Sequence, residues 1–145
     1  MPRERWGMLV RAGKACQVCS KAGRQDAQAP LQLSERDGYS VAVLNPRFVK
    51  PVDVETLGSF ACRAELVITF EDHVLRGGFG SAVLEELNTL GISVPVVRIG
   101  WPDQFIEHGK VEQLREKYGI SVQAALGKAR AQLRSRVKAL TFAAK

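Results

Sequence analysis

The chain of 145 residues is poor in the side chains that build disulfide frameworks and metal centres. It contains three cysteines and two histidines. A small, odd number of cysteines without a secretory leader argues against a disulfide scaffold. Cys16 and Cys19 have the spacing of a zinc or redox motif. Zinc, however, needs about four ligands, no second cysteine pair follows, and His73 and His108 stand alone. We expect no metal site.

Long apolar runs are also missing. No stretch approaches the ~20 residues that a membrane-spanning helix needs, and the basic start of the chain is not followed by the apolar segment of a signal peptide. The 46% hydrophobic and 25% charged content is ordinary for a globular domain. The sequence therefore predicts a single α/β domain in a cytoplasmic setting.

Acidic residues are absent from the last 29 positions, and this makes the charge uneven. Residues 1–34 carry six basic and two acidic residues, residues 35–116 carry eight and thirteen, and residues 117–145 carry seven and none. A basic end can attract nucleic acid or another anionic surface. More often such charges form the solvated face of a helix, which is the interpretation that we favour.

The first 34 residues show no clear period and no strand of useful length. The texture changes at Glu35. A β-branched apolar run over 39–44 predicts a buried strand, and a helix from about Asp53 to Arg63 follows it. We therefore expect a divergent, poorly ordered segment over 1–34, an ordered domain over 35–145, and a sheet that lacks one strand.

The stretch from Leu66 to Gly109 is the most informative part of the chain. It predicts a strand up to Phe70, a turn containing Gly77, Gly78 and Gly80, a helix over 81–90, and a strand over 94–99. This order is one βαβ unit, the building block of a parallel sheet covered by helices. A short helix over 111–118 and a long basic helix starting after Ser121 complete the pattern.

These blocks, with the segment Asn45-Pro46-Arg47-Phe48-Val49-Lys50-Pro51-Val52-Asp53 before them, resemble the C-terminal domain of the 1-deoxy-D-xylulose-5-phosphate synthase family. These enzymes are thiamine-diphosphate-dependent relatives of transketolase. The resemblance covers roughly Glu35 to Ile120. It implies a mixed, mostly parallel sheet in a three-layer fold of the transketolase C-terminal type.

The resemblance also implies a function. The full enzyme binds thiamine diphosphate and Mg²⁺, and condenses pyruvate with glyceraldehyde 3-phosphate in isoprenoid precursor synthesis. Its C-terminal domain packs against the thiamine-binding domains and contributes to a homodimer. No catalytic, cofactor or metal residue of the family maps onto this chain, so we expect a non-catalytic assembly domain that is a fragment, a split-gene subunit or a degenerate copy.

The glycine turn over 77–80 is the first candidate site. Backbone N–H groups at a helix N-terminus often hold phosphate, and Arg76 adds positive charge. The spacing matches neither dinucleotide nor P-loop motifs, so close packing and a positive φ are the favoured explanation. The alternative is a stand-alone anion- or nucleotide-binding module that uses this turn. A second alternative is a nucleic-acid binder that uses the basic C-terminal helix.

Other candidates are weaker. Glu71, Asp72 and His73 follow a strand end, where an acid–base pair could lie, but a polar loop or an interface is favoured. Arg47 and Lys50 could bind an anion or pair with acidic residues of a partner. We expect His108 to be a hydrogen-bonded structural residue and Asp103 to cap a helix. Three apolar side chains of the loop after the last strand are expected to pack inward: Trp101, Phe105 and Ile106.

Overall fold

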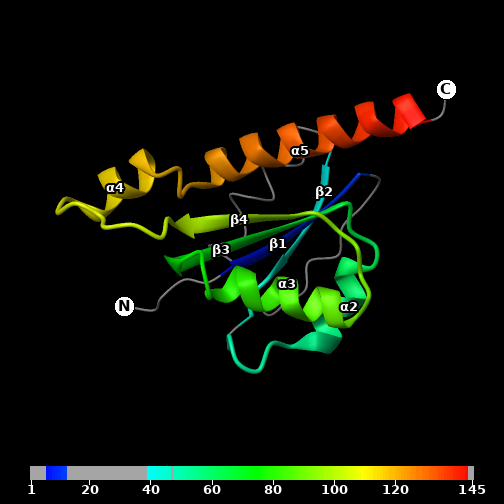
Figure 1. Ribbon diagram of the computed structural model, residues 1–145, viewed down its shortest axis with the longest axis horizontal. Helices are drawn as coiled ribbons and strands as arrows, with labels where there is room; N and C mark the ends of the chain where they lie inside the picture. Colours follow the sequence, from blue (N-terminus) through cyan, green and yellow to red (C-terminus); the bar gives the residue numbers. More distant parts are fainter. Residues whose placement is uncertain (1–5, 13–38, 47, 144–145) are drawn as a thin grey trace.

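The computed structural model describes residues 6–12, 39–46 and 48–143. The elements run in the order β1 (Trp6–Ala12), β2 (Tyr39–Leu44), α2 (Val54–Ala61), β3 (Leu66–Val74), α3 (Phe79–Thr89), β4 (Val96–Trp101), α4 (Val111–Lys117) and α5 (Val122–Ala143). Three layers result, with α2 and α3 on one face of the sheet and α5 on the other (Figure 1).

The sheet has the strand order β2-β1-β3-β4. β1 is antiparallel to both of its neighbours, whereas β3 and β4 are parallel. Three strands therefore run in one direction and finish at the same edge of the sheet, which we call the carboxyl edge. The predicted mixed three-layer α/β fold and its βαβ unit, β3-α3-β4, are confirmed.

The expectation of a sheet lacking a strand is wrong. Residues 6–12 form β1 in the middle of the sheet, where they pair with β2 on one side and β3 on the other. The other residues of the predicted N-terminal segment, 1–5 and 13–34, lie outside the described residues, as do Cys16 and Cys19. The division of the chain at residue 34 therefore stays a prediction.

Strands β2 and β3 divide their side chains between two cores because successive residues point to opposite faces. On one face of the sheet, Val41, Val43 and Ile68 pack against α5. The buried α5 side chains in this core are Ala125, Leu126, Ala129 and Leu133. On the other face, Ala42 and Val67 pack against α2 and α3. The buried helix side chains in this core are Leu57, Ala61, Phe79, Val83 and Leu87. A strand buried on both faces explains the near-continuous apolar run in β3.

The helix boundaries follow local signals in the sequence. Asp53 accepts a hydrogen bond from the Thr56 N–H at 3.0 Å at the start of α2, and Ser121 accepts one from the Ala124 N–H at 3.2 Å at the start of α5. Gly91 and Gly119 end α3 and α4 with φ of 67° and 66°, as expected for glycine after a helix. No helix among the described residues is long and apolar enough to cross a membrane.

Candidate functional site

The glycine turn joins the end of β3 to the start of α3 at the carboxyl edge. Gly77 has a φ of 65°, a conformation that glycine adopts without strain. Gly78 has a φ of −84° and is extended, so its conformation does not require glycine. The expected positive φ therefore holds at Gly77 and is wrong at Gly78.

The carboxylate of Glu71 occupies the N-terminus of α3. This side chain is only 2% exposed. Its Oε2 accepts a hydrogen bond from the Phe79 N–H at 2.6 Å, and its Oε1 accepts one from the Gly80 N–H at 3.1 Å. The first N–H groups of a helix have no partner within the helix, and a negative charge is favoured there. The glycine turn thus already holds an anion, and that anion belongs to the chain itself.

Glycines leave the space that Glu71 fills. A Cβ atom at Gly78 would lie 1.9 Å from Glu71 Oε2 and 2.5 Å from the Val74 carbonyl oxygen. A Cβ atom at Gly100, on the neighbouring strand β4, would lie 2.8 Å from Glu71 Cγ. All three distances are far below van der Waals contact, so side chains at these positions would displace the carboxylate.

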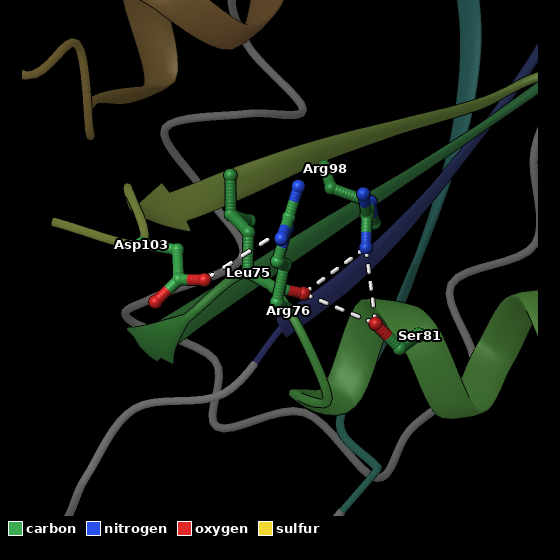
Figure 2. Close-up of polar contacts among 5 residues, drawn as sticks. All are labelled: Leu75, Arg76, Ser81, Arg98 and Asp103. Atoms are coloured by element: carbon green, nitrogen blue, oxygen red, sulfur yellow. Dashed lines mark hydrogen bonds and ion pairs between the residues drawn. The ribbon is translucent and has the colours of Figure 1, made fainter.

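Arg98 ties β4 to the same turn. Its Nη1 donates to the Leu75 carbonyl oxygen and to Ser81 Oγ, both at 3.0 Å, and Ser81 Oγ donates to the Leu75 carbonyl at 3.1 Å (Figure 2). A strand, a turn and a helix are joined by these three hydrogen bonds. The arrangement fixes α3 on the sheet.

The candidate residues Glu71, Asp72 and His73 are divided among different partners. The structure places all three in the extension of β3 beyond Phe70 rather than in a loop. Glu71 caps α3, whereas Asp72 Oδ1 accepts the Trp101 Nε1–H at 2.7 Å. His73 is exposed, and its Nδ1 lies 3.1 Å from the Val74 carbonyl oxygen. Glu71 and Asp72 have different partners because successive strand residues point to opposite faces.

The loop over 102–110, between β4 and α4, is fastened on both sides. Arg115 Nη2 donates to Asp72 Oδ2 at 3.2 Å. The Trp101 and Tyr118 rings meet edge to face, with their centroids 5.9 Å apart. These contacts hold α4 against the ends of β3 and β4.

Glu107, within this loop, accepts hydrogen bonds from Lys117 Nζ and Tyr118 Oη. The Lys117 and Tyr118 hydrogen bonds lower the pKa of Glu107 from 4.5 to about 2. The same contact raises the pKa of Lys117. Glu107 therefore pins the loop to α4 through charge-assisted hydrogen bonds.

Two expectations about this loop are wrong. The Phe105 side chain is 96% exposed instead of packing inward, while Trp101 and Ile106 are half-buried. Asp103 caps no helix, because α4 begins after Lys110; its Oδ2 lies 3.8 Å from Arg76 Nε in an ion pair across the two loops (Figure 2).

The remaining candidates lie apart from the glycine turn or outside the described residues. His108 and Lys50 are exposed, and Arg47 is not described. In the part of the chain that the structure describes, no three His, Cys, Asp or Glu side chains are grouped closely enough to hold a metal ion. On α5, Lys128 and Arg134 are exposed, in keeping with a solvated helix face.

Sequence reasoning missed the roles of Glu71 as a cap and of Arg98 as a tie. Glu71 had one partial signal: a carboxylate directly after an apolar run, eight residues before a helix that follows glycines rather than a capping side chain. The adjacent Asp72 shares this signal, so the sequence does not single out Glu71. For Arg98, the only sign was a basic residue inside an otherwise apolar strand.

Comparison with known proteins identifies the family to which this fold belongs. The family model described as "Transketolase, C-terminal domain" matches residues 9–124, and the chain belongs to this family. This match begins within β1, earlier than Glu35, where the resemblance read from the sequence begins.

The curated relatives that resemble this chain include 1-deoxy-D-xylulose-5-phosphate synthases. The 1-deoxy-D-xylulose-5-phosphate synthase of Acidobacterium capsulatum is 70% identical over 93 residues, which cover 64% of this chain and 15% of that protein. The 1-deoxy-D-xylulose-5-phosphate synthase 2 of Geobacter sulfurreducens is 44% identical over 125 residues, which cover 84% of this chain and 20% of that protein. The chain thus spans a small part of the length of these relatives.

A solved structure described as "Split gene transketolase, inactive beta4 tetramer" superposes with a TM-score of 0.62 and 31% identity. The superposition covers 74% of this chain and 34% of that chain. The similarity extends from sequence to three-dimensional arrangement.

Proposed function

We propose that this chain is the non-catalytic C-terminal domain of a 1-deoxy-D-xylulose-5-phosphate synthase and that it supports the assembly of that enzyme. The observation that carries the proposal is the Glu71 carboxylate on the N–H groups of Phe79 and Gly80. The turn that best suits a phosphate is taken by the protein's own anion. What remains at the carboxyl edge is a set of structural ties.

Thiamine diphosphate and Mg²⁺ belong to the full enzyme in this proposal. The described residues do not fit the cofactor, because a diphosphate at the glycine turn would compete with a buried carboxylate of the same sign. The thiamine-binding domains would come from the same polypeptide or from a second chain. The neighbour described as a split-gene transketolase supports the second possibility, and homodimerisation of the full enzyme stays part of the proposal.

The alternative of an anion- or nucleotide-binding module is disfavoured by the same contact. A ligand at the glycine turn would have to displace Glu71 from two hydrogen bonds. The alternative of nucleic-acid binding through α5 rests on its exposed basic residues, such as Lys128 and Arg134. A salt-dependent affinity for nucleic acid would be its signature.

The test is calorimetric titration of the purified chain with thiamine diphosphate and Mg²⁺, followed by an assay with pyruvate and glyceraldehyde 3-phosphate. Cofactor chemistry requires the domain that binds the cofactor, so we expect neither saturable heat nor product. Inorganic phosphate and ATP, added separately, should leave the melting temperature unchanged, because a ligand raises it only by binding the folded state. Saturable micromolar binding of the cofactor would refute the proposal.

A further inference from the structure

Phe105 stands out from the surface of the 102–110 loop. Its side chain is 96% exposed, and Val111, at the start of α4, is 50% exposed. Burying a phenylalanine ring against a partner is more favourable than leaving it in water. An aromatic ring presented in this way is typical of the anchor of a protein interface.

The loop around Phe105 is held in place before any partner arrives. Glu107 is hydrogen-bonded to Lys117 and Tyr118 on α4, and the strand end before the loop is tied through Trp101 to Asp72. A loop that is already ordered loses less conformational entropy on binding. The structure therefore favours a docking role for this exposed ring.

The loop that carries Phe105 also takes part in an exposed ion pair. Arg76, from the glycine-turn side, points toward Asp103 of the 102–110 loop (Figure 2), and their side chains are 84% and 58% exposed. An aromatic anchor with charged groups at its margin matches the usual anatomy of protein interfaces.

The sheet topology indicates what docks there. Trp6, the first residue of β1, pairs with Phe70 near the end of β3, and Val74 pairs with Trp101 at the end of β4. β1 therefore enters the sheet at the carboxyl edge, where β4 leads into the 102–110 loop (Figure 1). A domain preceding β1 in the polypeptide would reach the sheet at this edge, and the family is described as a C-terminal domain.

From this placement we propose that the 102–110 loop, with Phe105 as its anchor, docks onto the thiamine-binding part of the synthase. This inference rests on the proposed function. The assembly forms through this loop. The Phe105 ring enters a pocket of the partner, and the Arg76 and Asp103 side chains form hydrogen bonds with the partner at the margin of that pocket.

The experiment uses the full-length Acidobacterium capsulatum synthase in which this chain replaces the region that it matches. Phe105→Ser is introduced into this exchanged synthase, with Leu90→Ser as the control, because Leu90 is also an exposed apolar residue (41%) and follows the C-terminal end of α3. Scanning calorimetry and product formation are measured for all three proteins. The melting temperature of the isolated chain with and without each substitution reports on folding.

We expect Phe105→Ser to reduce product formation about tenfold or more, as truncation of a central interface residue does, and to separate the unfolding of this domain from that of the rest. The isolated chain should melt at an unchanged temperature, because the ring contributes little to its own fold. Leu90→Ser should retain one coupled transition and near-normal activity.

If Phe105→Ser and Leu90→Ser give the same product formation and the same unfolding transitions, the docking surface is wrong and the proposed function still stands. An exchanged synthase that is inactive without any substitution would refute the proposed function, and the docking surface with it. If Phe105→Ser instead dissolves a dimer of the isolated chain in sedimentation experiments and leaves the exchanged synthase unaffected, a second copy occupies the surface and the inference is wrong.

Discussion

At the scale of single residues, the carboxyl edge is organised around a buried carboxylate and the glycines that make room for it. The cap role of Glu71 could not be assigned over Asp72 from the sequence, because its partners, Phe79 and Gly80, meet it only after β3 and α3 have packed together. Phe105 was expected inside because it is apolar. A single apolar residue in a loop carries no information on which way it points, so only the structure could place it outside.

Gly78→Ala should destabilise the fold by about 1–3 kcal/mol, the usual effect of an extra methyl group in a tightly packed site. The reason is space, since the new Cβ would lie 1.9 Å from Glu71 Oε2. Gly127→Ala on α5 is the matched control. Nothing lies within 4 Å of its added Cβ, and alanine favours a helix over glycine by about 1 kcal/mol. Urea unfolding of both variants measures the difference, and equal stabilities would contradict the packing argument.

Glu107 should give the domain an acid-dependent stability. Its pKa in the folded state is about 2, below the ordinary value of 4.5. Such a lowered pKa stabilises the folded state above pH 4.5, and the contribution is lost as the pH falls from there toward 2. The effect is small because the group is exposed. Unfolding free energies of the wild type and Glu107→Gln, measured across this range, should converge with falling pH; a constant difference would show that Glu107 does not titrate as described.

At the scale of elements, periodicity was a reliable guide where the apolar run was continuous and flanked by glycine or a capping residue. β3, α3 and β4 were predicted on that basis, and Asp53 and Ser121 start their helices as expected. β1 was missed because its seven residues include Gly7 and Arg11 and no alternation stands out. Its stability as a strand comes from its two neighbours, which lie far away in the sequence.

The position of β1 leads to a prediction for amide hydrogen exchange. β1 has a hydrogen-bonded neighbour on each side, whereas β4 has only β3 in the described sheet. Amides over 6–12 should therefore exchange as slowly as those of β3, and alternate amides of β4 should exchange faster. Exchange is followed by NMR after transfer into D₂O. Exchange of the β1 amides at unfolded-chain rates would restore the expectation of a poorly packed N-terminal segment.

At the scale of the whole molecule, the fold class followed from the sequence because the βαβ unit and the family blocks lie in one continuous stretch. The proposed docking surface did not follow from the sequence, because it depends on a loop that is exposed at a sheet edge. The carboxyl edge brings together the glycine turn, the start of β1 and the 102–110 loop (Figure 1). Internal ties occupy the turn, and the loop presents Phe105 to a partner.

The most direct measurement of the assembly role is product formation by the exchanged Acidobacterium capsulatum synthase carrying the unsubstituted chain. Its comparison is the same synthase with the matching region deleted. If this domain supports assembly, the exchanged enzyme binds thiamine diphosphate and forms product at a rate close to that of the parent synthase. The deleted form does neither. A deleted form that is as active as the exchanged one, or an exchanged form that is inactive although this domain is folded within it, would contradict the account.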